Sequence, residues 1–106
     1  MSANPWAGEV EVTLDGQPHV AKLTLGALAA LEAELGAESM IAAVERFEGG
    51  RFATRDVLAV LVAGLRGGGW QGRTEDLLTV EIGGGPVGAA RAAAELLARA
   101  FRLEAP

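Results

Sequence analysis

The sequence predicts an α+β fold that is mostly α: an N-terminal β-hairpin at about 8–23, followed by a compact bundle of four to five short helices. Two observations lead to this prediction. The first stretch alternates apolar and polar residues, as strands do, and reaches Asp15-Gly16, a strong hairpin signal. The rest of the chain carries leucine, valine and alanine at helical spacing, between glycines that can end helices. At 106 residues the chain should form a single domain, 1–106.

The predicted hairpin has two strands with one apolar side. Residues 9–14 alternate valine and leucine with glutamate and threonine, and a two-residue turn at Asp15-Gly16 brings back the second strand. Pro18 cannot donate a ladder hydrogen bond, so it should face an open edge. A lone hairpin is marginally stable in water and must lie against helices or another chain. The side chains expected on its buried side are Val10, Val12, Leu14, Ala21 and Leu23.

Two short helices are expected next, at 25–36 and 39–48. Thr24 is a good N-cap for the first, and Gly36 would end it. Ser39 would cap the second helix in the same way. The apolar stripes expected to face the core are Leu25, Leu28, Leu31 and Leu35 in the first helix, and Met40, Ile41, Val44 and Phe47 in the second.

A third helix, at 54–66, is the best candidate for the centre of the core. Thr54 would be its N-cap, and Asp56 in the first turn suits the positive helix end. Its apolar residues cover a wide arc, as expected for a helix with neighbours on several sides. They are Val57, Leu58, Leu61, Val62 and Leu65.

Three glycines, 67–69, follow this helix and raise the question of a phosphate-binding loop. Such a loop precedes its helix, because the ligand is held by amides at the helix N-terminus. These glycines come after a helix, and neither G-x-x-x-x-G-K-[ST] nor G-x-G-x-x-G is present. We therefore interpret them as a helix end followed by a link.

The last third of the chain predicts two more helical segments, at 74–82 and 86–102. Thr74 can cap the first, but its valine and isoleucine leave the choice between helix and strand open. A second glycine triplet, 83–85, separates the two, and Pro86 suits the first turn of the last helix. The stripe expected to pack in that helix is Val87, Ala90, Ala94, Leu97 and Phe101.

Composition excludes several classes of function. The formal net charge of −5, with a single lysine, argues against general nucleic-acid binding. The lack of cysteine removes disulfides, thiol catalysis and cysteine zinc sites. The N-terminus resembles no signal peptide, and the longest strictly apolar run, 57–63, is far shorter than the roughly 20 residues that cross a bilayer. We expect a soluble, cytoplasmic protein.

No set of residues predicts catalysis. His19 is the single histidine, and a catalytic histidine needs an orienting partner and a nucleophile nearby. The motifs G-x-S-x-G and H-E-x-x-H are absent. We therefore predict that the chain is not an enzyme and uses no cofactor or metal.

The two tryptophans are the more informative residues. Each could cover an edge of the small core, or it could anchor a partner, because tryptophan is enriched among binding hot spots. Glycines 67–69 would let Trp70 reach a partner, whereas Arg66 is explained as a favourable charge at the helix end. The candidate partner-binding residues are Trp6, Leu65, Arg66, Trp70, Leu97 and Phe101.

The order of these features resembles the small gene-transfer-agent family proteins, which are encoded among the tail genes of alphaproteobacterial gene transfer agents and related siphophages. The resemblance runs over nearly the whole chain, through NPWAGEVEVTLDG, LTLGALAALEAELG, TRDVLAVLVAGLRGGG and the Ala-rich last helix. Its most specific pieces are Asp15-Gly16, 23–28, Leu35-Gly36 and 63–69. None of them is a catalytic signature.

This resemblance implies a tail assembly chaperone, although some members are labelled tail tube proteins. Such a chaperone would coat the hydrophobic helices of the tape measure protein, in the cytoplasm of the host bacterial cell, until tube subunits polymerise around it. The implied partners are the tape measure protein and tail tube subunits, with a homo-oligomer as a further option and neither nucleic acid nor membrane. The alternative is a structural tail tube subunit. A single predicted hairpin argues against it, since tube subunits generally need enough β-structure to close a ring.

Overall fold

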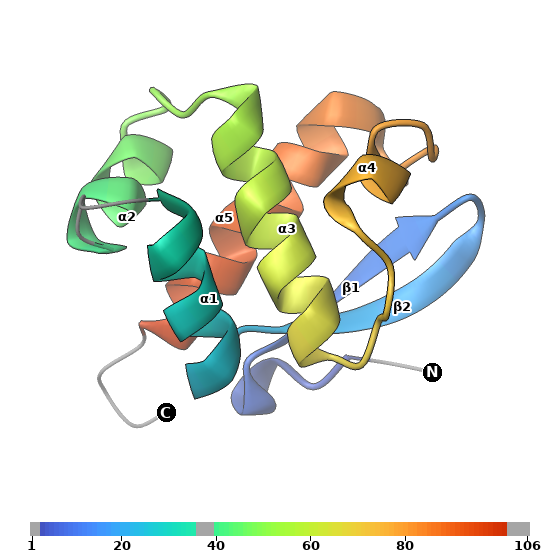
Figure 1. Ribbon diagram of the computed structural model, residues 1–106, viewed down its shortest axis with the longest axis horizontal. Coiled ribbons are helices and arrows are strands. Elements are labelled where there is room, and N and C mark those ends of the chain that lie inside the picture. The colour runs from blue at the N-terminus through green and yellow to red at the C-terminus, as the bar shows by residue number, and fades with distance from the viewer. Residues whose placement is uncertain (1–2, 36–39, 102–106) are drawn as a thin grey trace.

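The computed structural model describes residues 3–35 and 40–101 (Figure 1). The order of its helices and strands confirms the predicted α+β fold, which is mostly α. Gly36 and Ser39, which were expected to end the first helix and to cap the second, lie outside the described residues. The elements are η1 (Pro5–Ala7), β1 (Glu9–Leu14), β2 (Gln17–Lys22), α1 (Leu25–Leu35), α2 (Met40–Glu48), α3 (Thr54–Gly67), α4 (Thr74–Leu77) and α5 (Gly85–Ala100).

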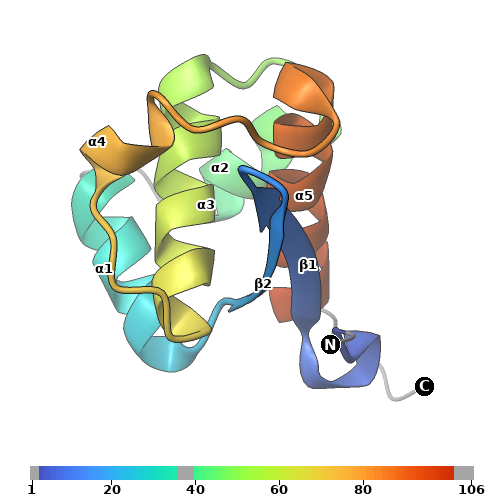
Figure 2. The same cartoon turned by 90° about the vertical axis from the view of Figure 1, so that its right-hand side faces the viewer.

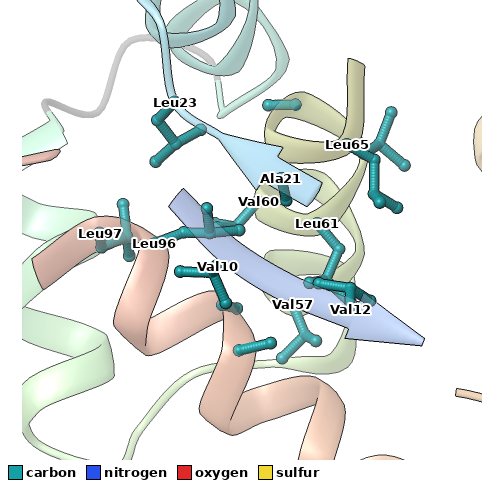
Figure 3. Close-up of a cluster of buried hydrophobic side chains, with 14 of the residues drawn as sticks. Val10, Val12, Ala21, Leu23, Val57, Val60, Leu61, Leu65, Leu96 and Leu97 are labelled. Carbon is teal, nitrogen blue, oxygen red and sulfur yellow. The ribbon is translucent and has the colours of Figure 1, made fainter. Parts of the chain in front are cut away.

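Helix α3 is the centre of the molecule, as predicted. It lies between α1 on one side and α5 on the other (Figure 2). Strand β2 packs against α3, strand β1 packs against α5, and α2 also contacts α5. The buried side of the hairpin therefore faces two helices at once, and Figure 3 shows side chains of both strands gathered with those of α3 and α5. Val60, Leu61 and Leu65 of α3 are completely buried there.

The hairpin has the predicted register and turn. Leu14 pairs with Gln17 across a two-residue turn whose central residues, Asp15 and Gly16, have φ of 50° and 82°. Two left-handed residues in succession match the type I′ turn that favours such sequences. Pro18 pairs with Thr13, a position whose amide points away from β1 in this alternating ladder, so the missing donor costs no pairing with β1.

The prediction of one helix over 74–82 is wrong. Helix α4 ends at Leu77, and further along the chain Ile82 forms a β-bridge with Leu14. The amide of Asp15 donates to the carbonyl of Glu81 at 2.8 Å, and the amide of Glu81 donates to the Asp15 carboxylate at 2.8 Å. The end of this segment therefore covers the outer edge of β1 near the turn through an isolated β-bridge. Its β-branched residues suit that conformation, which the sequence alone had left open.

The glycines that end α3 let it touch the outer edge of β2 without side chains between them. A Cβ atom placed on Gly67 would overlap the carbonyl of Lys22, and one placed on Gly68 would overlap the carbonyl of Val20. The helix stops at Gly67, as predicted, and the next glycines lead into the link. The triplet is thus a helix end and also a packing surface for a strand.

The capping predictions hold in part. The hydroxyl of Thr24 accepts the amide of Ala27 at 3.1 Å, which confirms Thr24 as the cap of α1. Thr54 is not a cap: α3 begins at Thr54, and the N-cap position is Ala53. The carboxylate of Asp56 accepts the amide of Ala53 at 2.8 Å instead. This contact differs from the one expected of Thr54, because an N-cap side chain accepts an amide of the first turn, whereas Asp56 accepts the amide of the N-cap residue.

The apolar stripes of α1 and α2 are mostly as predicted: Met40 and Phe47 are buried, and Leu28, Leu35 and Val44 are partly buried against the core. Leu31 is buried, but Leu25 is 86% exposed and Ala27 takes its place in the core. In α2, Ile41 is exposed and Ala43 is buried. Both helices are rich in small apolar residues on several faces, so spacing alone fits more than one orientation.

Helix α5 shows the same effect more strongly. Its buried residues are Ala89, Ala92, Ala93, Leu96 and Leu97, of which the predicted stripe contained Leu97 alone. Val87 is exposed, and Phe101 after the helix is 38% exposed. The contact with α3 decides the orientation, because Gly64 of α3 leaves room for the side chain of Leu96. Pro86 lies in the first turn, as predicted.

The close contact between α3 and β2 leads to a stability prediction. Gly67→Ala should lower the free energy of unfolding by about 1–3 kcal/mol, because its methyl group meets the backbone of β2. Gly26→Ala is the matched control: its Cβ would make only an ordinary contact, 3.9 Å from the Thr24 hydroxyl, in an exposed helical turn, so it should stabilise by about 0.5–1 kcal/mol. Urea unfolding of both variants checks this. Equal stability of the two would contradict the backbone contact.

A second stability prediction concerns the hairpin turn. Gly16→Val places a β-branched residue at positive φ and should cost about 1–3 kcal/mol. Asparagine tolerates that conformation, so Gly16→Asn should lose clearly less stability than Gly16→Val. Thermal melting of the two variants makes the comparison. A wild-type melting temperature for Gly16→Val would show that the turn is of another type.

Candidate partner-binding surface

Two of the six predicted partner-binding residues lie in the core. Leu65 is 0% exposed and Leu97 is 2% exposed, and both appear among the packed side chains of Figure 3. The structure therefore corrects the sequence prediction for these two: they pack in the core and are not accessible to a partner in this fold.

Trp6 belongs to η1, before β1, and Phe101 directly follows α5. The guanidinium of Arg99 donates to the carbonyl of Glu9, which ties α5 to the start of β1. Trp6 is 69% exposed. Its amide donates to the side chain of Asn4 at 3.0 Å, and the carbonyl of Asn4 accepts the amides of Ala7 and Glu9. This exposed aromatic residue thus stands on a hydrogen-bonded turn.

Arg66 and Trp70 belong to a folded loop. Arg66 donates through Nε and Nη2 to the carbonyl of Gly72, at 3.2 and 3.1 Å. The amide of Trp70 donates to the carbonyl of Leu65 at 2.9 Å, and the half-buried indole lies so close to Gly72 that a Cβ there would overlap it. Trp70 is therefore held against its own loop, and it lines a shallow hollow with Pro18 and His19 at the outer edge of β2.

Sequence reasoning missed a groove between α1 and α3. Two hollows, of about 460 and 170 Å³, share Glu34, Arg55 and Ala59 in their walls and so adjoin each other along this groove. Residues of both helices line it, and α4 reaches one end of it at Thr74. A signal for it was present, because 55, 59, 62 and 66 recur at helical spacing on one face of α3. Of these four positions, the sequence analysis expects only Val62 in the core.

Arginine is the dominant charge along this groove. Arg46, Arg51, Arg55 and Arg66 line its walls. Arg46 is bound to the buried carboxylate of Asp56, through Nη2 at 3.3 Å and Nε at 3.4 Å. The Asp56 carboxylate also accepts the amide of Ala53 at the start of α3. Its negative charge is therefore balanced by contacts within the protein. Arg51 and Arg55 lie exposed at the same end of the groove.

Two further features bear on chemistry and location. Among the described residues, no group of three or more histidine or acidic side chains is placed to hold a metal ion. Over the same part of the chain, none of the helices has the length and apolar character needed to span a bilayer.

The burial of the six candidates leads to a prediction. Leu97→Ala should lower the free energy of unfolding by about 2–5 kcal/mol, because it opens a cavity in the core. Trp6→Ala removes a larger but mostly exposed side chain and should change stability by about 0.5 kcal/mol or less. Chemical unfolding followed by circular dichroism measures both. A large loss for Trp6→Ala would mean that the indole supports the fold.

The comparisons with known proteins place the chain in a family. No curated protein and no solved structure gives a significant match. The family described as phage tail tube protein, GTA-gp10, matches residues 7–103. This match covers nearly the whole chain, so the protein belongs to the GTA-gp10 family of phage tail tube proteins, which confirms its resemblance to gene-transfer-agent tail proteins.

Proposed function

We propose that this phage tail family protein acts as a tail assembly chaperone, which binds helical segments of the tape measure protein and keeps them soluble. The role is one of binding, and we propose no catalytic step for the chain. The apolar outer face of α1 is the observation that carries the proposal.

Helix α1 lies at the surface, and its first two turns are apolar on all sides, whereas Glu32 and Glu34 are exposed in its last turn. Its first seven residues, 25–31, contain no charged side chain. Leu25, Ala29 and Ala33 follow one another at a spacing of four and are all exposed. A helix that is apolar all round is usually buried, so this outer face is suited to cover by another molecule. Helix-in-groove contact with an apolar helix is the route that such a surface offers.

The sheet supports a chaperone more than a tube subunit. The outer edge of β1 is bonded to the strand-like segment around Ile82, and the outer edge of β2 carries Pro18 and lies against Gly67 and Gly68. Little edge is therefore left for pairing with another subunit. A ring built by sheet pairing would require these contacts to open.

A structural tail tube subunit remains the second candidate, because the family is described by that name. The two roles differ in where the protein ends up. A tube subunit stays in the finished particle in many copies, whereas an assembly chaperone leaves it. Mass spectrometry of purified particles distinguishes them: absence from the tail supports the chaperone, and stoichiometric presence supports the subunit.

Co-expression with the tape measure protein of the same gene cluster tests the chaperone directly. The soluble fraction of the tape measure protein should rise several-fold, and the two proteins should purify together. Leu25→Glu should reduce both effects, because it puts a charge on the apolar face of α1. The change should be tolerated by the fold, since Leu25 is exposed and an acidic residue suits a helix N-terminus.

Val87→Glu is the matched control for this experiment. Val87 is also exposed, and it also lies in the first turn of its helix, but on α5. It should behave like the wild type. If the wild-type protein neither rescues nor retains the tape measure protein, the chaperone role is wrong.

A further inference from the structure

The groove between α1 and α3 has an apolar floor of helical length. Leu31 and Val62 are buried beneath it, and Leu58 and Ala59 are half-buried along it. The arginines at 55 and 66 are eleven residues apart on α3, which corresponds to about 16 Å or three helical turns. Ala30, an exposed small residue, forms part of the α1 wall and would let another helix approach closely.

The charge of the groove is opposite to that of the chain. Its lining has four arginines and two carboxylates, one of which is the buried Asp56. Glu34 is the other, so positive side chains dominate the solvent-exposed rim. The chain as a whole has a formal net charge of −5. A positive strip on an acidic protein favours a ligand that carries negative charge.

We propose that this groove binds an amphipathic helix whose apolar stripe is flanked by acidic side chains. The apolar residues of that helix would lie on Leu58 and Ala59, and its carboxylates would reach Arg51, Arg55 and Arg66. A small anion would use the arginines but leave the apolar floor uncovered, so a helix fits both features. The identity of the helix as part of the tape measure protein rests on the proposed function; the chemistry of the groove does not.

Two synthetic peptides of about 18 residues, long enough to form helix on binding, test the groove. Both carry the same leucine stripe, and they differ in having glutamate or lysine beside it. Fluorescence anisotropy should show binding of the glutamate peptide, weaker binding at high salt, and little binding of the lysine peptide. Equal binding of the two peptides would overturn the proposal, because the arginines would then play no part.

Charge reversal in the protein supplies the second arm. Arg55→Glu should weaken binding of the glutamate peptide about tenfold, since it replaces an attraction at the rim by a repulsion. Arg55 lies in the first turn of α3, where glutamate is favourable, so the variant should fold. Arg91→Glu changes the same charge on the exposed face of α5 and should have less than about a twofold effect. An equal effect of both variants would overturn the proposal.

A steric pair on α1 adds a test that does not depend on charge reversal. Ala30→Leu puts a larger side chain into the groove, whereas Ala29→Leu changes an equally exposed neighbour that does not line it. Ala30→Leu alone should weaken binding. If the wild type is a dimer that Arg55→Glu separates, the groove is occupied by a second copy and the proposal is wrong.

Failure of this proposal can be told apart from failure of the proposed function. If the wild type and Arg55→Glu retain the tape measure protein equally well, the function stands and the groove is the wrong surface. If the glutamate peptide binds but the wild type retains no tape measure protein, the groove stands and the chaperone role fails.

Discussion

The contact between the end of α3 and the edge of β2 governs the arrangement of the whole fold. Two successive glycines bring the helix backbone against the carbonyls of Val20 and Lys22, a distance at which no side chain would fit. The hairpin is thereby held against α3 with its apolar side turned to α3 and α5. One side of α3 is used for this purpose, and α1 must pack on another (Figure 2). That division leaves the seam between α1 and α3 at the surface.

The same contact explains why the sheet stays small. Strand β2 is closed on its outer side by the helix end and by Pro18, and β1 is closed near the turn by the segment around Ile82. Edge strands that are covered in this way do not add further strands readily. The surface left for partners is therefore helical, and its exposed apolar residues lie mainly on helices and in the turns beside them.

A structural feature could be predicted from the sequence where neighbouring residues alone determine it. The hairpin, its register and its turn follow from alternation and from Asp15-Gly16, and the structure reproduces them. The orientation of α5 did not follow, because alanine makes several of its faces equally apolar and only the fit of Leu96 to Gly64 selects one. The structure confirms the packing that helical spacing predicts for Leu65 and Leu97, and it corrects their assignment to a partner surface. The groove was missed because its walls come from two helices, although Arg55 and Arg66 were visible at helical spacing.

The size of the groove also bears on how a chaperone of this kind could release its partner. A contact about 16 Å long covers three turns of one helix, and this is much smaller than a standard stable interface. On the α1 wall, the small side chain of Ala30 contributes little apolar area. Exposed arginine–carboxylate pairs at the rim add modest affinity and act mainly on association rate. A single copy would therefore bind weakly, and retention of a long helical partner would require many copies along it. In this proposal, tube subunits could displace such copies one at a time, since no single contact is strong enough to block polymerisation.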